Sequence, residues 1–247
     1  MGALSGEWNG QTISGGRKMA KNIGILGTGM VGQTIAGRFL ELGDQVMVGT
    51  RDVKNTLAQK EPSPMGLPPF GEWHKKHPNV KLGSFTDAAK FGEIIFLCTK
   101  GNVTVDAVKL AGSENFKGKT VVDISNPLDF SKGMPPSLIP QLSNTNSVGE
   151  EVQNALPDAN VVKSLNIVNC EVMVNARKSG GSPTMFVAGN NPSAKAQVAG
   201  VLRQFGWEDI MDLGDISSSR GMEMMLPIWL RIWGATKNGY IGFKIVR

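Results

Sequence analysis

Cysteine, histidine and tyrosine are scarce in the 247-residue sequence, which contains two, two and one of them. The two cysteines, Cys98 and Cys170, cannot build the disulfide framework of a small secreted domain, and no Cys/His spacing matches a zinc site. We therefore expect no metal site and a reducing, cytoplasmic setting. No stretch approaches the roughly 20 apolar residues of a membrane span, so we expect no membrane association.

Strong charge is also missing. The formal net charge is +5, and no arginine-rich run or RNA-binding signature accompanies it, so nucleic acid is not an expected partner. A mild positive bias suits an anionic cofactor. The 40% hydrophobic content is ordinary for a globular protein, and the length suffices for one large domain or a domain with an appendage.

The first 18 residues are glycine-rich and lack apolar periodicity. They contain no apolar core of a secretory signal, and Gly6 breaks the myristoylation pattern that the opening Met-Gly begins. We expect residues 1–18 to be a disordered tail or a tag, with Met19 as a candidate natural start.

The most informative stretch is the glycine-rich turn Gly27-Thr28-Gly29-Met30-Val31-Gly32. The spacing GxGxxG is typical of a turn that holds a dinucleotide pyrophosphate. Gly27 allows the tight turn, Gly29 lets the backbone approach the pyrophosphate, and Gly32 lets helix and strand pack closely. The helix that follows would direct unpaired N–H groups and its positive dipole end at the phosphates.

The surroundings of this turn match a βαβ unit. An apolar strand is expected over 21–26, an amphipathic helix over 30–42, a helix-ending glycine at Gly43, and a second strand over 45–49. This order of elements is the context in which GxGxxG indicates dinucleotide binding.

The end of the second strand favours NADP over NAD. An NAD site usually carries Asp or Glu here to bind the ribose 2′-OH, whereas this chain has Thr50 and Arg51, followed by Asp52 and Lys54. A hydroxyl and a guanidinium suit a 2′-phosphate. We expect Asp52 to face the opposite side. An ordinary polar helix start is the alternative interpretation of Arg51 and Lys54.

Strands and helices continue to alternate, apart from a proline-rich insertion over 59–80 with a short helix over 71–77 and a connection over 129–147. Further strands are expected over 80–82, 94–98, 120–124, 160–163, 184–188 and 207–213, and helices over 84–90, 103–110, 148–156, 192–204 and 221–234. The pattern predicts an α/β fold with a Rossmann-type doubly wound parallel sheet.

Polar groups follow three of these strands. Ligands of an open parallel sheet sit beyond the carboxyl ends of its strands. We therefore expect the following residues beside the glycine-rich turn: Thr99, Lys100, Ser125 and Asn126. Asn166, after the strand over 160–163, could meet a nicotinamide. A turn-forming Asn-Pro is the alternative interpretation of Asn126.

Several of these segments together resemble the F420-dependent NADP reductases, a family of NADP oxidoreductases. The resemblance runs from Lys21 to the C-terminus. It rests on the glycine-rich turn and on residues 48–51, 123–127, 162–166, 212–216, 219–220 and 239–244. The NADPH–flavin oxidoreductase domain of STEAP metalloreductases is similar in three of these segments.

The resemblance implies an NADP-binding Rossmann domain over 19–164 and a small C-terminal α/β lobe over 165–247. The lobe would complete the substrate cleft and supply the interface of a homodimer. It also implies hydride transfer between NADPH and a deazaflavin (coenzyme F420) or flavin-like acceptor. Such cofactors need orientation rather than acid–base groups, so no catalytic side chain is nominated.

The resemblance also assigns residues to each part of the site. Thr28, Met30 and Val31 would line the pyrophosphate, and Thr99 and Lys100 would lie beside the nicotinamide. Residues 125–128 would lie beneath the deazaflavin, with residues 166–167 opposite. The expected cofactor-binding residues are Gly27, Thr28, Gly29, Met30, Val31, Gly32, Thr50, Arg51, Lys54, Thr99, Lys100, Ser125, Asn126, Pro127 and Asn166.

Two departures leave alternatives open. The insertion over 59–80 is longer than in the archaeal family members, and Asn166 stands where some relatives have His. One alternative is an NADP-dependent dehydrogenase of a small hydroxy acid or imine. Such enzymes usually append a long all-helical domain, whereas only 83 residues follow Ser164 here. The other is a non-catalytic NADP sensor. The apolar segment 222–233 is either core or a dimer interface.

Overall fold

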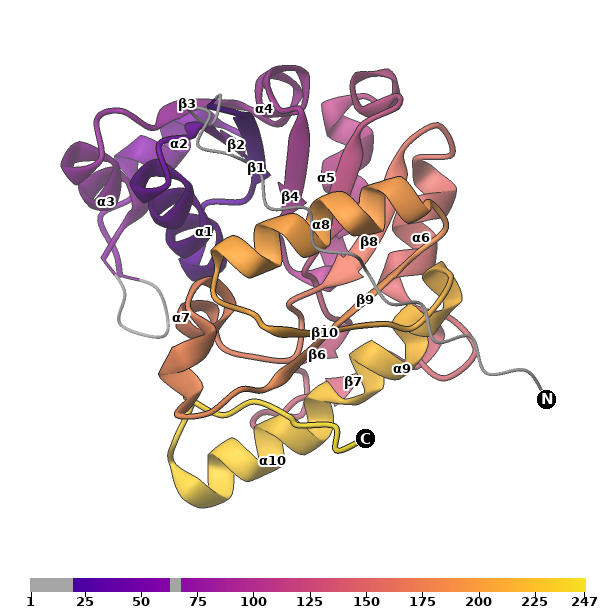
Figure 1. Ribbon diagram of the computed structural model, residues 1–247. Coiled ribbons are helices and arrows are strands. Elements are labelled where there is room, and N and C mark those ends of the chain that lie inside the picture. Colours follow the sequence, from indigo (N-terminus) through magenta and orange to yellow (C-terminus); the bar gives the residue numbers. More distant parts are fainter. Residues whose placement is uncertain (1–19, 63–67) are drawn as a thin grey trace, which may run out of the picture.

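The structure is a computed structural model that describes residues 20–62 and 68–247, so the expectation for residues 1–18 lies outside the described part. A single eight-stranded sheet forms its centre, in the order β10-β9-β8-β5-β4-β1-β2-β3 (Figure 1). The strands are β1 (Asn22–Leu26), β2 (Gln45–Thr50), β3 (Lys81–Ser84), β4 (Ile94–Leu97), β5 (Thr120–Asp123), β8 (Asn160–Ser164), β9 (Thr184–Gly189) and β10 (Asp209–Asp212).

Six neighbouring strands of the sheet are mutually parallel and confirm the Rossmann-type fold: β8, β5, β4, β1, β2 and β3. β9 pairs antiparallel with β8, and β10 pairs parallel with β9. The chain leaves β8 at the carboxyl edge and re-enters the sheet from that edge, which reverses the direction of β9. The sheet thus continues past Ser164, and the division into domains at this residue stays a prediction.

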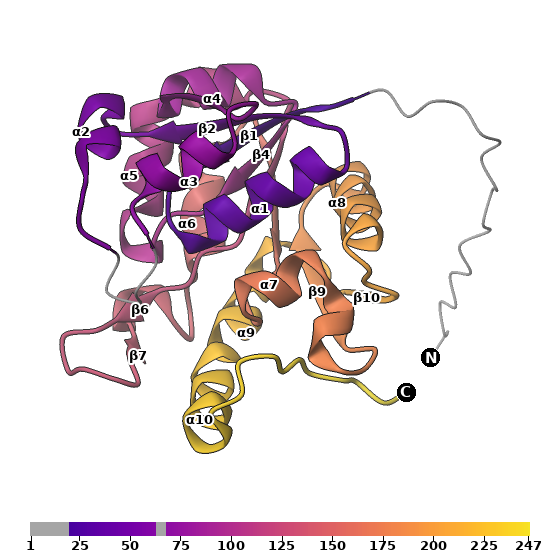
Figure 2. The same ribbon diagram turned by 90° about the vertical axis from the view of Figure 1, so that its left-hand side faces the viewer.

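Helices cover both faces of the sheet (Figures 1 and 2). Buried side chains of α1, α7 and α8 join one core cluster, and those of α4, α5 and α6 join a second. The helices are α1 (Met30–Glu41), α2 (Val53–Ala58), α3 (Phe70–Lys76), α4 (Phe85–Phe91), α5 (Gly101–Ala111), α6 (Val148–Ala155), α7 (Cys170–Val174), α8 (Pro192–Gln204), α9 (Ser219–Met224) and α10 (Leu226–Thr236).

Short elements fill the connections. A two-stranded hairpin of β6 (Leu128–Asp129) and β7 (Ser137–Leu138) follows β5. Single 3-10 turns are η1 (Ser113–Phe116), η2 (Pro140–Leu142), η3 (Ala176–Ser179) and η4 (Ile216–Ser218). Among residues 20–62 and 68–247, no helix has both the length and the apolar character needed to cross a membrane.

Aromatic packing fixes α1 against the sheet. The ring of Phe39 on α1 lies 5.2 Å from that of Phe96 on β4 and 5.2 Å from that of Phe205, which follows α8. All three side chains are at most 1% exposed. Tilted aromatic pairs at this distance are favourable. The helix that begins at the glycine-rich turn is therefore held firmly, which fixes the position of its N-terminus.

The C-terminal helical region differs from expectation. The helix expected over 221–234 is two helices, because α9 ends at Met224 and α10 begins at Leu226. Pro227 lies in the first turn of α10, where its missing N–H costs nothing, but it cannot continue a preceding helix. The short helix α7 and the β6–β7 hairpin were not predicted, because each is too short to show a periodic pattern.

Candidate functional site

The glycine-rich turn has the backbone that its sequence requires. Gly27 has a φ of +126°, and a Cβ at this residue would lie 2.6 Å from the carbonyl oxygen of Cys98. A Cβ on Gly32 would lie 2.1 Å from the carbonyl oxygen of Gly27. Both positions therefore exclude a side chain, as the sequence predicts for the tight turn and the close helix packing.

Gly29 is different, because a Cβ at this position would meet no atom within 4 Å. It is exposed and is the N-cap of α1, with no side chain capping the helix and no acidic residue in its first turn. The first N–H groups of a helix lack intrahelical partners, and its dipole attracts anions. Open space in front of these groups is the cradle that a pyrophosphate would fill.

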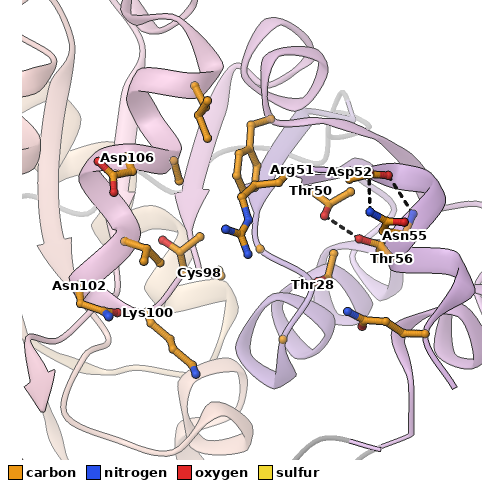
Figure 3. A pocket seen from close by; sticks show the side chains of 18 residues that line it. Thr28, Thr50, Arg51, Asp52, Asn55, Thr56, Cys98, Lys100, Asn102 and Asp106 are labelled. Atoms are coloured by element: carbon orange, nitrogen blue, oxygen red, sulfur yellow. Dashed lines mark hydrogen bonds between the residues drawn. The ribbon is translucent and has the colours of Figure 1, made fainter. Parts of the chain in front are cut away.

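A cleft of about 950 Å³ opens in front of this turn (Figure 3). Its walls come from the carboxyl ends of β1, β2 and β4 and from α2, α4 and α5, and every lining residue lies between Gly27 and Leu110. Seven expected site residues line it: Gly27, Thr28, Gly29, Thr50, Arg51, Thr99 and Lys100. The contribution expected from residues 165–247 stays a prediction.

Arg51 reaches into this cleft (Figure 3). The side chain is exposed and makes no hydrogen bond or ion pair with the described residues. The hydroxyl of Thr50 is buried and lies 2.7 Å from that of Thr56, so one of the two hydroxyls keeps a free hydrogen to donate. An unpaired guanidinium beside a hydroxyl donor is suited to a phosphate.

Asp52 borders the same cleft, but its carboxylate serves α2. Asp52 Oδ1 accepts the backbone N–H of Asn55 at 2.8 Å, and Asp52 Oδ2 accepts the side-chain amide of Asn55 at 2.8 Å. Figure 3 shows Asp52 pointing away from Arg51, as expected from the sequence. Its negative charge is thus partly neutralised by the helix that it caps.

Lys100 supplies a second cation to the cleft, at the start of α5. The neighbouring Thr99 hydroxyl lies 2.8 Å from the hydroxyl of Thr104. Lys54 is exposed on α2 and does not line the cleft. Its assignment to the cofactor therefore has less geometric support than that of Arg51, and it stays a prediction.

A smaller cavity of about 440 Å³ adjoins the cleft and shares Thr28, Gly29 and Gln59 with it. Met30 borders this cavity, as do Phe70 and other residues of the insertion over 59–80. The insertion forms a helix, α3, close to the range expected for it, although residues 63–67 lie outside the described part. Described residues at both ends of the 63–67 gap therefore lie close to the glycine-rich turn.

The residues expected at the redox end form a hydrogen-bonded pair. Asn126 Nδ2 donates to the carbonyl oxygen of Asn166 at 2.9 Å, and Asn166 Nδ2 donates to Asn126 Oδ1 at 2.9 Å and to the carbonyl oxygen of Met222 at 3.0 Å. Asn166 is only 2% exposed, and its Oδ1 has no partner among the described residues. Its expected contact with a nicotinamide stays a prediction.

The backbone beside this pair is strained. Leu165 is fully buried and has a φ of +62°, a conformation that residues other than glycine seldom adopt. Such conformations persist where the surroundings fix them, often at binding and catalytic sites. Here the strained residue turns the chain from the end of β8 to Asn166. Ser125 and Pro127 are buried beside the same turn, outside the lining of the cleft.

A buried ion cluster below Ser125 was missed at the level of sequence. Asp123, Lys163 and Glu223 are each at most 1% exposed, and the ammonium group of Lys163 lies within ion-pair distance of both carboxylates. Burial raises the pKa of Glu223. Burial alone would lower the pKa of Lys163, but the two carboxylates outweigh it and leave this pKa above its ordinary value. A lysine within the apolar strand β8 was the available signal, since buried lysines need partners.

Comparisons with known proteins place these features in a family context. The family described as NADP oxidoreductase, coenzyme F420-dependent, matches residues 22–127. The F420-dependent NADP reductase of Methanocaldococcus jannaschii is 30% identical over 159 residues, which cover 64% of this chain and 70% of that protein.

A crystal structure from Arthrobacter sp. FB24, provisionally named an F420-dependent NADP-reductase, shares 48% identity and a TM-score of 0.87. The match covers 92% of this chain and 100% of that chain. Rat metalloreductase STEAP3 is 26% identical over 217 residues, or 86% of this chain. The chain spans only 38% of the length of that protein.

Proposed function

Because the chain belongs to the family of coenzyme F420-dependent NADP oxidoreductases, we propose that it transfers a hydride between NADPH and a deazaflavin or flavin-like acceptor. Membership of this family makes the protein an NADP-dependent oxidoreductase. Coenzyme F420 is the acceptor that the names of the two F420-reductase relatives favour.

The unpaired Arg51 guanidinium carries the NADP half of the proposal. Arg51 and the Thr50–Thr56 hydroxyl pair would hold the 2′-phosphate. The open cradle at Gly29 and the uncapped N-terminus of α1 would hold the pyrophosphate. The volume of about 950 Å³ lies within the range of small-molecule sites.

When bound, NADPH would supply a hydride to the ring of the acceptor, and the accompanying proton would come from solvent, so no acid–base side chain is required. The task of this chain is then to orient the two reacting carbons at roughly 3–3.5 Å. Thr99 and Lys100 would flank the nicotinamide, because they line the cleft at the end of β4. The Asn126–Asn166 pair would form the floor on the acceptor side, at the ends of β5 and β8.

A homodimer completes the proposal. Met224 and Ile228 on α9 and α10 are 42% and 51% exposed although both side chains are large and apolar. Covering such side chains is typical of interface cores. Sedimentation equilibrium should give twice the monomer mass, and Ile228→Glu should shift it toward the monomer. Because Cys98 and Cys170 are both free, we also propose a reducing, cytoplasmic setting.

The acceptor is tested by mixing the protein and NADPH with coenzyme F420, FMN, FAD or a quinone, and following the absorbance of reduced nicotinamide. We expect oxidation with F420 or a flavin. Gly29→Val serves as the matched control, because a Cβ at this position would meet no atom within 4 Å and the branched side chain would occupy the pyrophosphate cradle. Oxidation with none of these acceptors would refute the proposal.

A further inference from the structure

The ammonium group of Lys163 sits at the centre of three acceptors from different parts of the chain. It donates to Asp123 Oδ2 at 2.9 Å and to the carbonyl oxygen of Ser125 at 2.5 Å. It also lies 2.6 Å from Glu223 Oε1 on α9. An ammonium group has three hydrogens, so each of the three acceptors can accept one. Lys163 lies on β8 and Glu223 on α9, so the ammonium group links the backbone of Ser125 to both elements.

The two carboxylates that share this ammonium have further donors. Asp123 Oδ1 accepts the backbone N–H of Ser125 at 2.9 Å and its hydroxyl at 2.6 Å. The Glu223 carboxylate accepts the backbone N–H groups of Val148 and Gly149, at 3.0 and 3.1 Å, at the start of α6. Every carboxylate oxygen in the cluster thus has a donor, which a buried ionic group requires.

The Ser125–Asn126 turn, which contacts this cluster, also packs against elements that line the cleft. A Cβ on Gly101 would lie only 2.1 Å from the carbonyl oxygen of Asn126, so the turn packs directly against the start of α5. Gly101 follows Lys100, which lines the cleft. On its other side, Asn126 is paired with Asn166. The loops after β4, β5 and β8 are therefore in direct contact with one another, with Lys163 beneath them.

We propose that Lys163 is a positioning residue: it holds the Ser125–Asn126 turn, and through this turn the start of α5, in the orientation that receives the nicotinamide ring. The proposal rests on the proposed function, since it takes the cleft to be the NADP site. Lys163 itself touches no cofactor, because it is fully buried. It acts through the backbone carbonyl of Ser125 and the loops packed against it.

Stability alone is a weak reason for such a cluster. A buried ion pair often contributes no more than apolar residues of the same volume, because removing its charges from water is costly. The cluster also lies at the carboxyl edge of the sheet, where the strand ends meet the cleft. A positioning role explains why three charges are buried at this edge rather than elsewhere in the core.

The test compares NADPH with 2′-phospho-ADP-ribose, which has the same phosphates and adenosine but lacks nicotinamide. Both affinities are measured by calorimetry for the parent and for Lys163→Met, which keeps the length of the side chain. The quantity compared is the affinity for NADPH divided by the affinity for 2′-phospho-ADP-ribose. We expect this ratio to be roughly tenfold lower in the variant than in the parent, a factor typical of one well-placed hydrogen bond. The affinity for 2′-phospho-ADP-ribose itself should stay within about twofold of the parent value.

Because both ligands are measured on the same protein, the folded fraction cancels from this ratio. Should Lys163→Met not fold, the triple variant Asp123→Asn, Lys163→Met, Glu223→Gln removes all three charges and leaves none uncompensated. Lys119→Met is the matched control. Lys119 also donates to backbone carbonyls, those of Ala89 and Lys90, but it lies just before β5, at the opposite edge of the sheet, and should leave the ratio unchanged.

A change of the ratio below threefold in a folded variant, or an equal loss for both ligands, would overturn the positioning role. The oxidation of NADPH by coenzyme F420, FMN, FAD or a quinone, measured on the parent protein, tests the proposed function separately. A parent that reduces no acceptor refutes the proposed function, whereas the ligand ratio reports on Lys163 whether or not an acceptor is found.

Discussion

Replacement of Arg51 by alanine is the sharpest test of the cofactor assignment. The guanidinium has no partner among the described residues, so its removal should change the free energy of unfolding by no more than about 0.5 kcal/mol. Its contribution to a 2′-phosphate should be large, since a hydrogen bond to a charged group contributes about 1.5–3 kcal/mol. The side chain is exposed, and screening by salt keeps the expected total near 2–3 kcal/mol.

This energy corresponds to a roughly 30- to 150-fold weaker Kd for NADPH. The Kd for NADH should change by less than about threefold, because NADH has no 2′-phosphate for Arg51 to bind. Isothermal titration calorimetry at fixed ionic strength measures both ligands on one preparation. Lys54→Ala is the comparison: Lys54 is a nearby cation that does not line the cleft, so its removal should weaken NADPH binding less than the removal of Arg51. Equal losses for NADPH and NADH would refute the 2′-phosphate assignment.

Three further expectations concern glycines and pH. Gly29→Val should keep the melting temperature of the parent but weaken NADPH binding at least tenfold, because its side chain would enter open space in the cradle; unchanged affinity would rule out the cradle. Gly32→Ala should instead lower the free energy of unfolding by about 1–3 kcal/mol, since its Cβ would lie 2.1 Å from a backbone oxygen; an unchanged denaturation midpoint would contradict this. A hydrogen bond from Lys244 is the main cause that lowers the pKa of Asp209 from 3.8 to about 2. The folded pKa is the lower one, so this stabilisation is present above pH 4 and is lost as the pH falls toward 2. Asp209→Asn should make the melting temperature depend less on pH between pH 4 and 2. An unchanged pH dependence would contradict the contribution of Asp209 to stability.

Local chemistry explains which parts of the fold could be predicted from the sequence. The glycine-rich turn was predictable because backbone conformation dictates its residues, as the positive φ of Gly27 shows. The position of Arg51 in the cleft was predictable because the end of a parallel strand fixes where the next side chain lies. The long helices and buried strands were also found, since their apolar periodicity is strong.

Features that depend on distant partners were not predictable in the same way. The ion pair of Lys163 with Glu223 joins residues 60 positions apart, and no local sequence pattern predicts which carboxylate pairs with Lys163. The reversal of β9 follows from how the chain returns through the short helix α7. Pro227 could have indicated the division between α9 and α10, because proline seldom lies within a helix.

Direct hydride transfer is the central claim, and the most direct test follows one turnover with NADPH deuterated at the transferable position of its nicotinamide. Coenzyme F420 is the acceptor of choice, because the ring position that receives the hydride is a carbon, so the label does not exchange with water. We expect nicotinamide oxidation and deazaflavin reduction in a single phase, with the deuterium recovered on the deazaflavin. NADPH that binds but is never oxidised would contradict the account and favour a sensor, and oxidation only by carbonyl compounds or imines would favour a dehydrogenase.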